Sequence, residues 1–353
     1  MTVRTLGELS ILVLGVTLVL LCAGIAAAKV AGEHARRRRE QRRAELRPVL
    51  LEALEDGDLA VELPRRLGDD ELDTIVGLLG HLRGGDRTRL ASVLERRGEL
   101  DAATSRLRSR GAARRRAAAE LLGATGHRPA APDLVLRLAD RDRSVRISAA
   151  RALGRIGSPS AVPALAAALE SGRVPANTVS MAILRIGPGA APGLVPFLVS
   201  PVPRMRVVAA ELVGSLGHTE SAPTVEGLLS DPEQLVREAA AHGLGRLASP
   251  ASVVPLSAAL VDALGGPVGA VDEPTAVAIV QALGQIGDRR SIPVLTGCLA
   301  RTYRISRAAS DALEPMGQRR SQASEAARAA TGSTDRIPGE TLAIGAPRRA
   351  STA

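Results

Sequence analysis

The feature that most constrains the fold is a pattern of small residues that recurs about every thirty residues along the 353-residue chain. Each small residue follows a run of aliphatic and alanine residues, and the intervals between successive markers are 31, 30, 30, 31, 39 and 30 residues. The markers are Gly126, Gly157, Gly187, Gly217, Ala248, Gly287 and Gly317. Self-similarity at this period indicates a chain that repeats one small structural unit many times.

Apolar residues keep fixed positions before each marker, and this predicts one helix per unit. The positions one, four and eight residues before the marker are apolar in nearly every unit, and these offsets share one face of an α-helix. The position four residues before the marker holds Leu122, Leu153, Ile183, Val213, Leu244, Leu283 and Leu313. We therefore expect Leu153, Leu244 and Leu283 to lie in the core, and the small residue at the eighth position to let a neighbouring helix approach.

A proline about six residues after the marker predicts a second helix in most units. This position holds Pro132, Pro163, Pro223 and Pro293. A glycine that closes one helix and a proline that opens the next are typical of a tight helical hairpin. A hairpin of ~30 residues cannot bury its apolar faces alone, so the hairpins must stack on one another. The sequence thus predicts an all-α fold, an α-solenoid of stacked hairpins, with the second helices expected to line its concave groove.

The unit resembles the short HEAT-like repeat of the type found in phycobilisome lyases, whose core reads Val-Arg-x-x-Ala-Ala-x-Ala-Leu-Gly. The Val-Arg step is matched by Val145-Arg146, Met205-Arg206 and Val236-Arg237. The resemblance covers residues 106–317 and implies a HEAT/armadillo-like solenoid, in which we expect Arg146, Arg206 and Arg237 to be structural. The units that begin near residues 175 and 275 lack this arginine, which argues against an uninterrupted Asp-to-Arg ladder.

Residues 9–28 form an uncharged stretch of twenty residues, long enough as a helix to cross the ~30 Å hydrocarbon core of a bilayer. Basic residues follow this stretch in excess, which predicts that residues 1–8 are extracytoplasmic and that the rest of the chain is cytoplasmic. The competing interpretation is a cleaved signal peptide, because Ala26, Ala27 and Ala28 resemble a cleavage site. The length of the apolar run and the arginines behind it favour a single-pass anchor in the cell membrane.

Residues 29–47 are expected to form a basic juxtamembrane helix. Its arginines are candidates for contact with anionic lipid or an acidic partner, although the same cluster also serves as an orientation signal before a solvated helix. The six residues concerned are Arg36, Arg37, Arg38, Arg39, Arg42 and Arg43. The later arginine-rich segment 106–116 is interpreted first as a solvated face and second as a contact for an acidic partner.

The other parts of the chain keep the repeat less well. Residues 48–105 are helical by pattern and are expected to form divergent hairpins that cap the array, for example at 71–79 and 87–96. Residues 262–272 form a glycine-rich insertion between two units. Residues 318–353 are polar and lack periodicity, so we expect a disordered tail there.

The sequence offers no visible set of catalytic residues, cofactor ligands or metal ligands. Its five histidines are scattered and none is followed by glutamate, which disfavours the His-Glu chemistry of HEAT-like di-iron hydroxylases. With one Phe, one Tyr and no Trp there is no platform for stacking bases, so the net charge of +9 does not predict specific nucleic-acid binding. We therefore expect a protein that is not an enzyme.

The function expected from these features is a membrane-anchored scaffold or adaptor that binds a protein partner at the cytoplasmic face. The alternative is a lyase-like enzyme, or an accessory factor, that modifies another protein. This alternative follows only from the resemblance, because shared folds do not by themselves confer chemistry.

Overall fold

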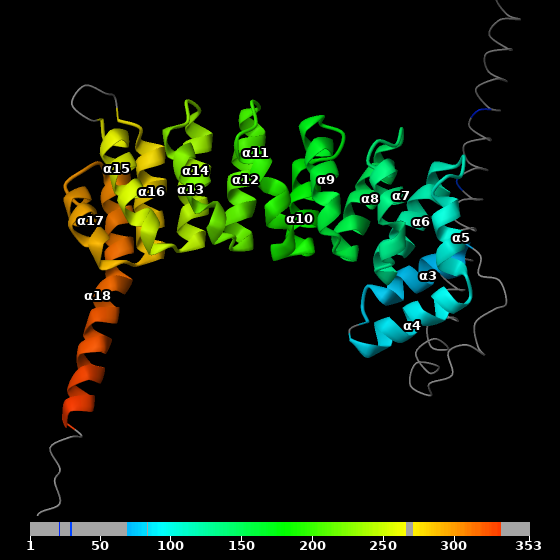
Figure 1. Cartoon of the computed structure of the whole chain (residues 1–353), viewed down its shortest axis with the longest axis horizontal. Helices are drawn as coiled ribbons and strands as arrows, with labels where there is room; N and C mark the ends of the chain where they lie inside the picture. Colours follow the sequence, from blue (N-terminus) through cyan, green and yellow to red (C-terminus); the bar gives the residue numbers. More distant parts are fainter. Residues whose placement is uncertain (1–20, 22–28, 30–68, 83, 266–270, 333–353) are drawn as a thin grey trace, which may run out of the picture. The chain divides into compact units, whose positions relative to one another are not determined.

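The computed structural model describes residues 21, 29, 69–82, 84–265 and 271–332, which form helices joined by short turns (Figure 1). No β-strand occurs among these residues, so the all-α helical repeat expected from the sequence is confirmed. The contacts divide the chain into two compact units, Met1–Leu216 and Gly217–Ala353.

In the first unit, long helices alternate with shorter ones after an initial group of three. The initial helices are α3 (Asp69–Leu79), α4 (Gly85–Arg96) and α5 (Glu99–Arg106). The long helices are α6 (Ala112–Thr125), α8 (Arg143–Ile156), α10 (Ala176–Ile186) and α12 (Pro203–Leu216). The second helices of the hairpins are α7 (Ala131–Arg137), α9 (Val162–Glu170) and α11 (Val195–Leu198).

The second unit repeats this alternation. Its second helices are α13 (Ala222–Gly227), α15 (Val253–Ala263) and α17 (Ile292–Cys298). Its long helices are α14 (Gln234–Leu247), α16 (Glu273–Ile286) and α18 (Tyr303–Gly332). In both units the second helices mostly follow one short turn of 3₁₀ helix, and a proline often occupies the first turn, where its missing N–H costs nothing.

Most long helices end at the marker residue because it adopts a left-handed backbone conformation. Gly126, Gly157 and Gly287 have φ of 73°, 71° and 68°, and each donates its N–H to the carbonyl four residues earlier. Glycine reaches this conformation without strain because it has no Cβ. Ala248 takes the same place at φ 50°, the only non-glycine residue with positive φ in the described part of the chain.

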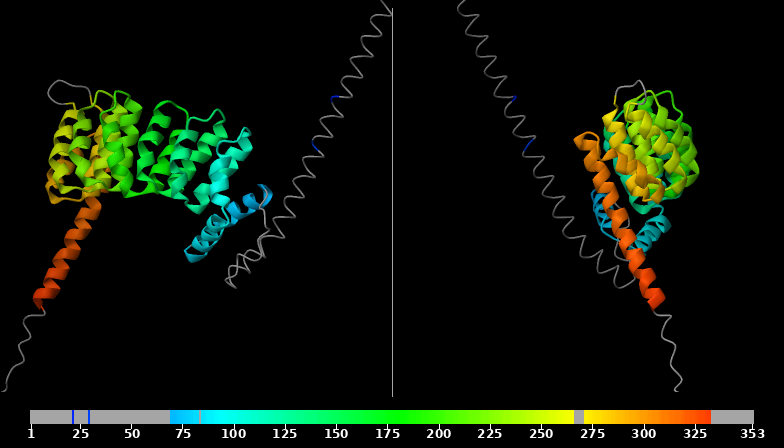
Figure 2. Two further views of the ribbon diagram at one scale, coloured as in Figure 1. Left: turned by 45° about the vertical axis from the view of Figure 1, so that its right-hand side comes forward. Right: turned by 90° about the vertical axis from the view of Figure 1, so that its left-hand side faces the viewer.

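At Gly317 the expected helix end is wrong, since α18 continues to Gly332 and projects beyond the hairpins of the second unit (Figure 2). Residues 318–331 are rich in Ala, Arg, Gln and Glu, which have high helix propensity, and no proline follows Gly317 to open a second helix. The helix therefore also covers 318–332, the start of the tail expected to be disordered. Residues 333–353 lie outside the described residues.

Neighbouring long helices make their closest approach at matched pairs of small residues. A Cβ placed on Gly123 would lie 2.6 Å from the Ala152 Cα, and one on Gly154 would lie 2.7 Å from the Ala182 Cα. The second unit repeats the arrangement at Gly245 with Ala282 and at Gly284 with Ala312. Each pair joins the position three residues before one marker to the position five residues before the next, so the close approach occurs at different positions from the one expected.

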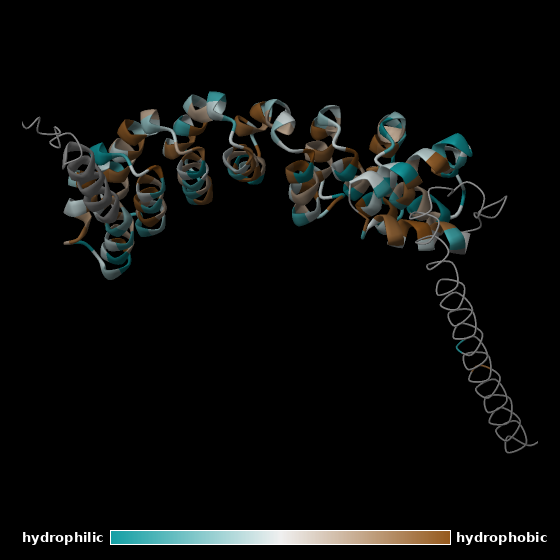
Figure 3. Cartoon of the chain, turned by 90° about the horizontal axis from the view of Figure 1, so that it is seen from below, coloured by the Kyte–Doolittle hydropathy of each residue, from teal (hydrophilic) through white to brown (hydrophobic). Residues whose placement is uncertain are grey.

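The long helices form the inner layer of each unit. Most pack directly along the next, as α8 does with α6 and α10, whereas the second helices meet their neighbours largely through the 3₁₀ turns; Figure 3 shows the helices end-on. A stack curves toward its more closely spaced layer, so the exposed face of the long helices is concave within each unit. The expectation that the second helices line the groove is therefore wrong, because the glycine and alanine pairs that permit close spacing lie on the long helices.

Several sequence expectations concern residues outside the described part of the chain. They include the span at 9–28 apart from Leu21, the basic segment 29–47 apart from Lys29, and residues 48–68 of the capping region 48–105. Among the described residues no helix is both long and apolar enough to cross a bilayer. In the described part of the capping region 48–105, α4 and α5 pack on each other and both contact α6.

Candidate functional site

The arginines of the Val-Arg step hold the backbone of the loop that precedes their own helix. The Nη1 atom of Arg146 donates to the carbonyl of Asp140 at 2.9 Å, and that of Arg206 donates to the carbonyl of Ser200 at 2.8 Å. Arg237 donates in the same way to Asp231 at 2.7 Å. In all three cases the acceptor lies six residues earlier, so one arginine satisfies a carbonyl that the preceding helix leaves unpaired.

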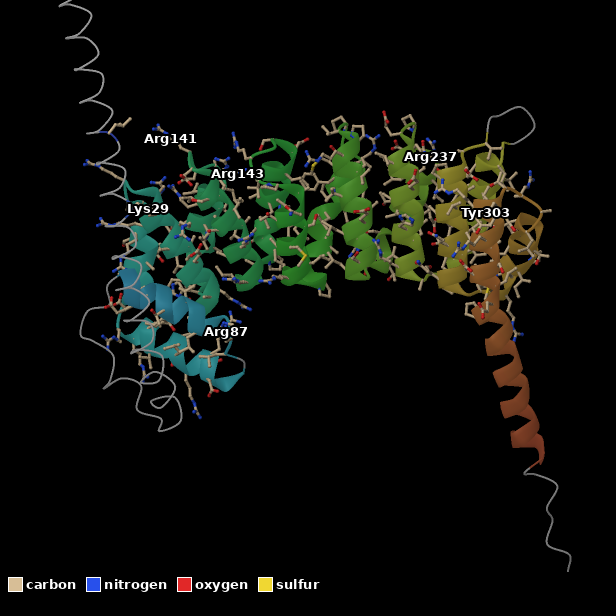
Figure 4. All side chains as sticks on the ribbon, turned by 180° about the vertical axis from the view of Figure 1, so that it is seen from behind. Lys29, Arg87, Arg141, Arg143, Arg237 and Tyr303 are labelled. Carbon is tan, nitrogen blue, oxygen red and sulfur yellow. The ribbon has the colours of Figure 1, made fainter. Side chains whose placement is uncertain are left out.

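The same guanidinium groups reach forward to the next loop when an acceptor is there. Arg237, which Figure 4 labels, bonds the Asp272 carboxylate through Nε at 3.1 Å and Nη2 at 2.7 Å. Arg146 instead donates its Nε to the carbonyl of Arg173 at 2.8 Å, because that loop holds no aspartate in the equivalent place. The expected gap in the Asp-to-Arg ladder is therefore present at the repeat that begins near residue 175.

Arg115 is a structural arginine that the sequence interpretation missed, because it was counted within the solvated segment 106–116. It bonds the Asp140 carboxylate through Nε at 2.8 Å and Nη2 at 2.7 Å. Burial works to raise the pKa of Asp140, but the hydrogen bonds from Arg115 and from the Asp142 N–H outweigh it and leave the pKa below its usual range. Arg115 stands eleven residues before Gly126, the offset shared by Arg146 and Gly157, and this spacing was the signal available.

The three leucines expected in the core are there. Leu153, Leu244 and Leu283 each have an exposed fraction of 0%. Each lies on a long helix, between the two layers of its unit. These residues serve packing and take no part in a site.

The predicted lipid-contact residues and the predicted absence of metal ligands differ in how far they fall within the described residues. Arg36, Arg37, Arg38, Arg39, Arg42 and Arg43 lie outside them, so their contacts are not described. Within the described ranges, no three His, Cys, Asp or Glu side chains come together in a way that could hold a metal ion.

The inner face of the first unit contains a cavity lined by arginines. Its volume is about 360 Å³, and the side chains around it come from α8 and α10. The lining residues are Arg151, Arg155, Asn177, Thr178, Met181, Ala182 and Arg185. Three of the seven are cationic and none is acidic, so the cavity is suited to an anionic group.

The arginines of this cavity crowd one another. Partial desolvation lowers the pKa of Arg155 below its usual value, and the positive charges of Arg185, Arg87 and Arg151 lower it further, while Glu120 opposes them. Arginine remains protonated at neutral pH in spite of such shifts. The site therefore keeps a concentrated positive charge at physiological pH.

A second cavity, of about 520 Å³, lies between α16 and α18 in the second unit. It is lined by Gln281, Gly284, Gln285, Ala308, Asp311, Ala312 and Pro315. No cationic side chain lines it, so it does not share the positive charge of the cavity in the first unit.

The sequence interpretation did not single out the arginine cavity. Arg151 and Arg155 lie six and two residues before Gly157, and Met181 and Arg185 hold the same positions before Gly187. These offsets lie opposite the buried face of the helix, so the repeat register identifies them as exposed positions of successive inner helices. The adjacent placement of α8 and α10 brings their charges together.

Comparisons with known proteins agree with this architecture. The model for HEAT repeats matches residues 100–181 and 191–271, and the model for the PBS lyase HEAT-like repeat matches residues 276–301. Among curated proteins, no sequence matches the chain.

Solved structures that match this chain include the complex of CpcE and CpcF of phycocyanin lyase from Nostoc sp. PCC7120. It is 20% identical with a TM-score of 0.28, over 72% of this chain and 97% of that one. Human deoxyhypusine hydroxylase in complex with glycerol is 21% identical with a TM-score of 0.32, over 71% and 97%. The karyopherin Kap121p bound to the extreme C-terminus of the protein phosphatase Cdc14p is 14% identical with a TM-score of 0.43, over 72% and 33%.

Matches at this level of identity assign neither a reaction nor a partner. The two family models, by contrast, fall on the hairpins whose helices and turns are described above. The repeat region of this chain is built from HEAT repeats and a PBS-lyase HEAT-like repeat.

Proposed function

We propose that the chain is a membrane-anchored scaffold that binds a protein partner on the inner face of its first unit. The observation that carries the proposal is the group of arginines on this face that have no acidic partner among the described residues. Arg151, Arg155 and Arg185 make no ion pair or side-chain hydrogen bond within the described contacts, whereas Arg115 on α6 and Arg237 on α14 are each paired with an aspartate.

Apolar side chains beside these arginines support a protein rather than a small ion as the partner. Met181 is 54% exposed and Leu184 is 37% exposed, and both lie on α10. Exposed methionine next to arginine is typical of protein interfaces, where both residue types are enriched. The inner face thus combines charge for orientation with apolar surface for affinity.

The anchor in this proposal is the uncharged segment 9–28, with residues 1–8 outside and the HEAT repeats in the cytoplasm. Its support is the length of the segment and the excess of arginine directly after it. Arg36, Arg37, Arg38, Arg39, Arg42 and Arg43 would lie close to the inner leaflet, where each basic residue near anionic lipid contributes about 1 kcal/mol.

Deletion of residues 9–28 tests the anchor. The full chain is expected to stay in the membrane pellet after an alkaline carbonate wash, because a spanning helix is not extracted by breaking ionic contacts. The deletion variant is expected in the supernatant. Extraction of the full chain by the wash, or appearance of a shortened chain cut after Ala28, would contradict the proposal.

A photoreactive amino acid tests the docking face in intact membranes from the native cells. Placed at Met181 on the inner layer, it is expected to crosslink a discrete partner. Placed at Leu136 on α7, which is 62% exposed on the outer layer, it is expected to crosslink none. Equal crosslinking from both positions, or crosslinking from Leu136 alone, would remove the inner face as the docking surface.

A further inference from the structure

The arginine cavity of the first unit has an uncompensated charge that is unusual for its surroundings. Among the described residues, Glu120 is the carboxylate that opposes the lowered pKa of Arg155. It already accepts hydrogen bonds from Arg116 at 2.9 Å and from the Ser148 hydroxyl at 3.0 Å. The positive charge of the cavity therefore has to be balanced by solvent ions or by a ligand.

The arrangement favours one compact, doubly charged group over several separated carboxylates. Arg151 and Arg155 are one helical turn apart on α8, and Arg185 joins them from α10 around a single cavity. Guanidinium groups form paired hydrogen bonds with the oxygens of phosphate, and a phosphorylated side chain has about −1.5 to −2 charge and three acceptor oxygens at pH 7.

Neutral groups in the cavity fit the same ligand. The amide oxygen of Asn177 accepts from the Thr178 hydroxyl at 3.4 Å, which leaves its N–H₂ group available to donate to an anion. Met181 and Ala182 supply an apolar wall on which the carbon atoms of a phosphorylated side chain can pack. A cavity of about 360 Å³ is large enough for such a side chain together with some neighbouring backbone.

We propose that this cavity binds a phosphoserine or phosphothreonine side chain of a partner protein. The proposal rests on the scaffold function above and adds the chemistry by which the partner is recognised. Binding would then depend on phosphorylation of the partner, so the scaffold would hold its partner conditionally.

Immobilised peptide pools provide the test, with the full chain in detergent as the soluble component. Three pools share degenerate flanking positions and carry a central phosphoserine, serine or glutamate. Retention on the phosphoserine pool is expected to exceed that on either other pool by about tenfold, because each charge-assisted hydrogen bond to phosphate adds strongly to affinity.

Variants that lose the same number of charges distinguish binding in the cavity from non-specific attraction to basic residues. Arg151→Gln, Arg155→Gln and Arg185→Gln together are expected to abolish the preference for phosphoserine. The control replaces Arg141, Arg143 and Arg173 by Gln, which removes the same charge from exposed positions in or beside the loops that precede α8 and α10, at the other end of the hairpins, where Figure 4 labels Arg141 and Arg143. This control is expected to retain the preference. Met181→Glu, which places a negative charge in the cavity and removes no arginine, is expected to abolish it as well.

Four results would overturn the proposal. The first two are equal retention on the phosphoserine and glutamate pools, and equal loss of the phosphoserine preference in the control and cavity variants. The third is an unchanged phosphoserine preference in Met181→Glu. The fourth is competition by vesicles containing phosphoinositides that exceeds competition by phosphoserine peptide. Phosphatase treatment of the membranes distinguishes this proposal from the scaffold function. Crosslinking from Met181 that survives phosphatase leaves the scaffold function intact and removes phosphate recognition.

Discussion

Replacement of Leu153 by alanine is expected to lower the free energy of unfolding by about 2–5 kcal/mol. The Leu153 side chain has an exposed fraction of 0% and lies on α8, which packs against α6, α7 and α10. Removal of its Cγ and two methyl groups loses buried apolar surface and leaves a cavity that the flanking helices can close only in part. Urea denaturation of the full chain in detergent, followed by circular dichroism, measures the change.

Leu136→Ala is the matched control for this measurement. Leu136 lies on α7 in the same unit and its side chain is 62% exposed, so its truncation is expected to change stability by less than about 0.5 kcal/mol. If both variants lose the same amount, burial between the two helix layers is not the source of stability in this unit.

Gly154→Ala is expected to destabilise the chain by about 1–3 kcal/mol, although alanine is the better helix former. A Cβ at this position would lie 2.7 Å from the Ala182 Cα and 2.9 Å from the Ala182 carbonyl oxygen. Both contacts involve backbone, so α8 and α10 would have to move apart. Thermal unfolding of the full chain, compared with the unaltered protein, measures the loss.

Gly77→Ala is expected to change the stability of the chain in the opposite direction, so it is the control for Gly154→Ala. Gly77 lies inside α3 of the same unit, and a Cβ there would meet nothing within 4 Å. The substitution is expected to stabilise the chain by roughly 0.5–1 kcal/mol through the higher helix propensity of alanine. A gain in stability from both substitutions would show that the helices α8 and α10 are not held at the close spacing described.

The helical hairpins were predictable because the signals that form them are local. The left-handed backbone at Gly157 ends one helix and Pro163 lies in the first turn of the next, and both effects depend on only a few neighbouring residues. Gly317 shows the limit of this reasoning. A glycine ends a helix only when the following residues favour another structure, and the alanine-rich sequence after Gly317 favours the same helix.

The candidate site was less predictable because it depends on which helices become neighbours. Arg151 and Arg185 are separated by more than thirty residues, and the pattern places each of them on an exposed face without saying that the faces converge. Prediction of the site also requires knowing which helices form the inner layer. This follows from pairs such as Gly154 with Ala182, which join one repeat to the next. Arg115, by contrast, was within reach of the sequence, since its register relative to Gly126 is that of the other structural arginines.

The positions two and six residues before Gly157 and Gly187 carry exposed side chains, since the helix contacts fall on the small residues and leucines beside them. Recognition and assembly are thereby encoded by separate sets of residues on the same helix. Replacement of Arg151, Arg155 or Met181 by different polar side chains should change which ligand the surface binds and leave the melting temperature unchanged. This surface is therefore a suitable starting point for libraries of altered specificity.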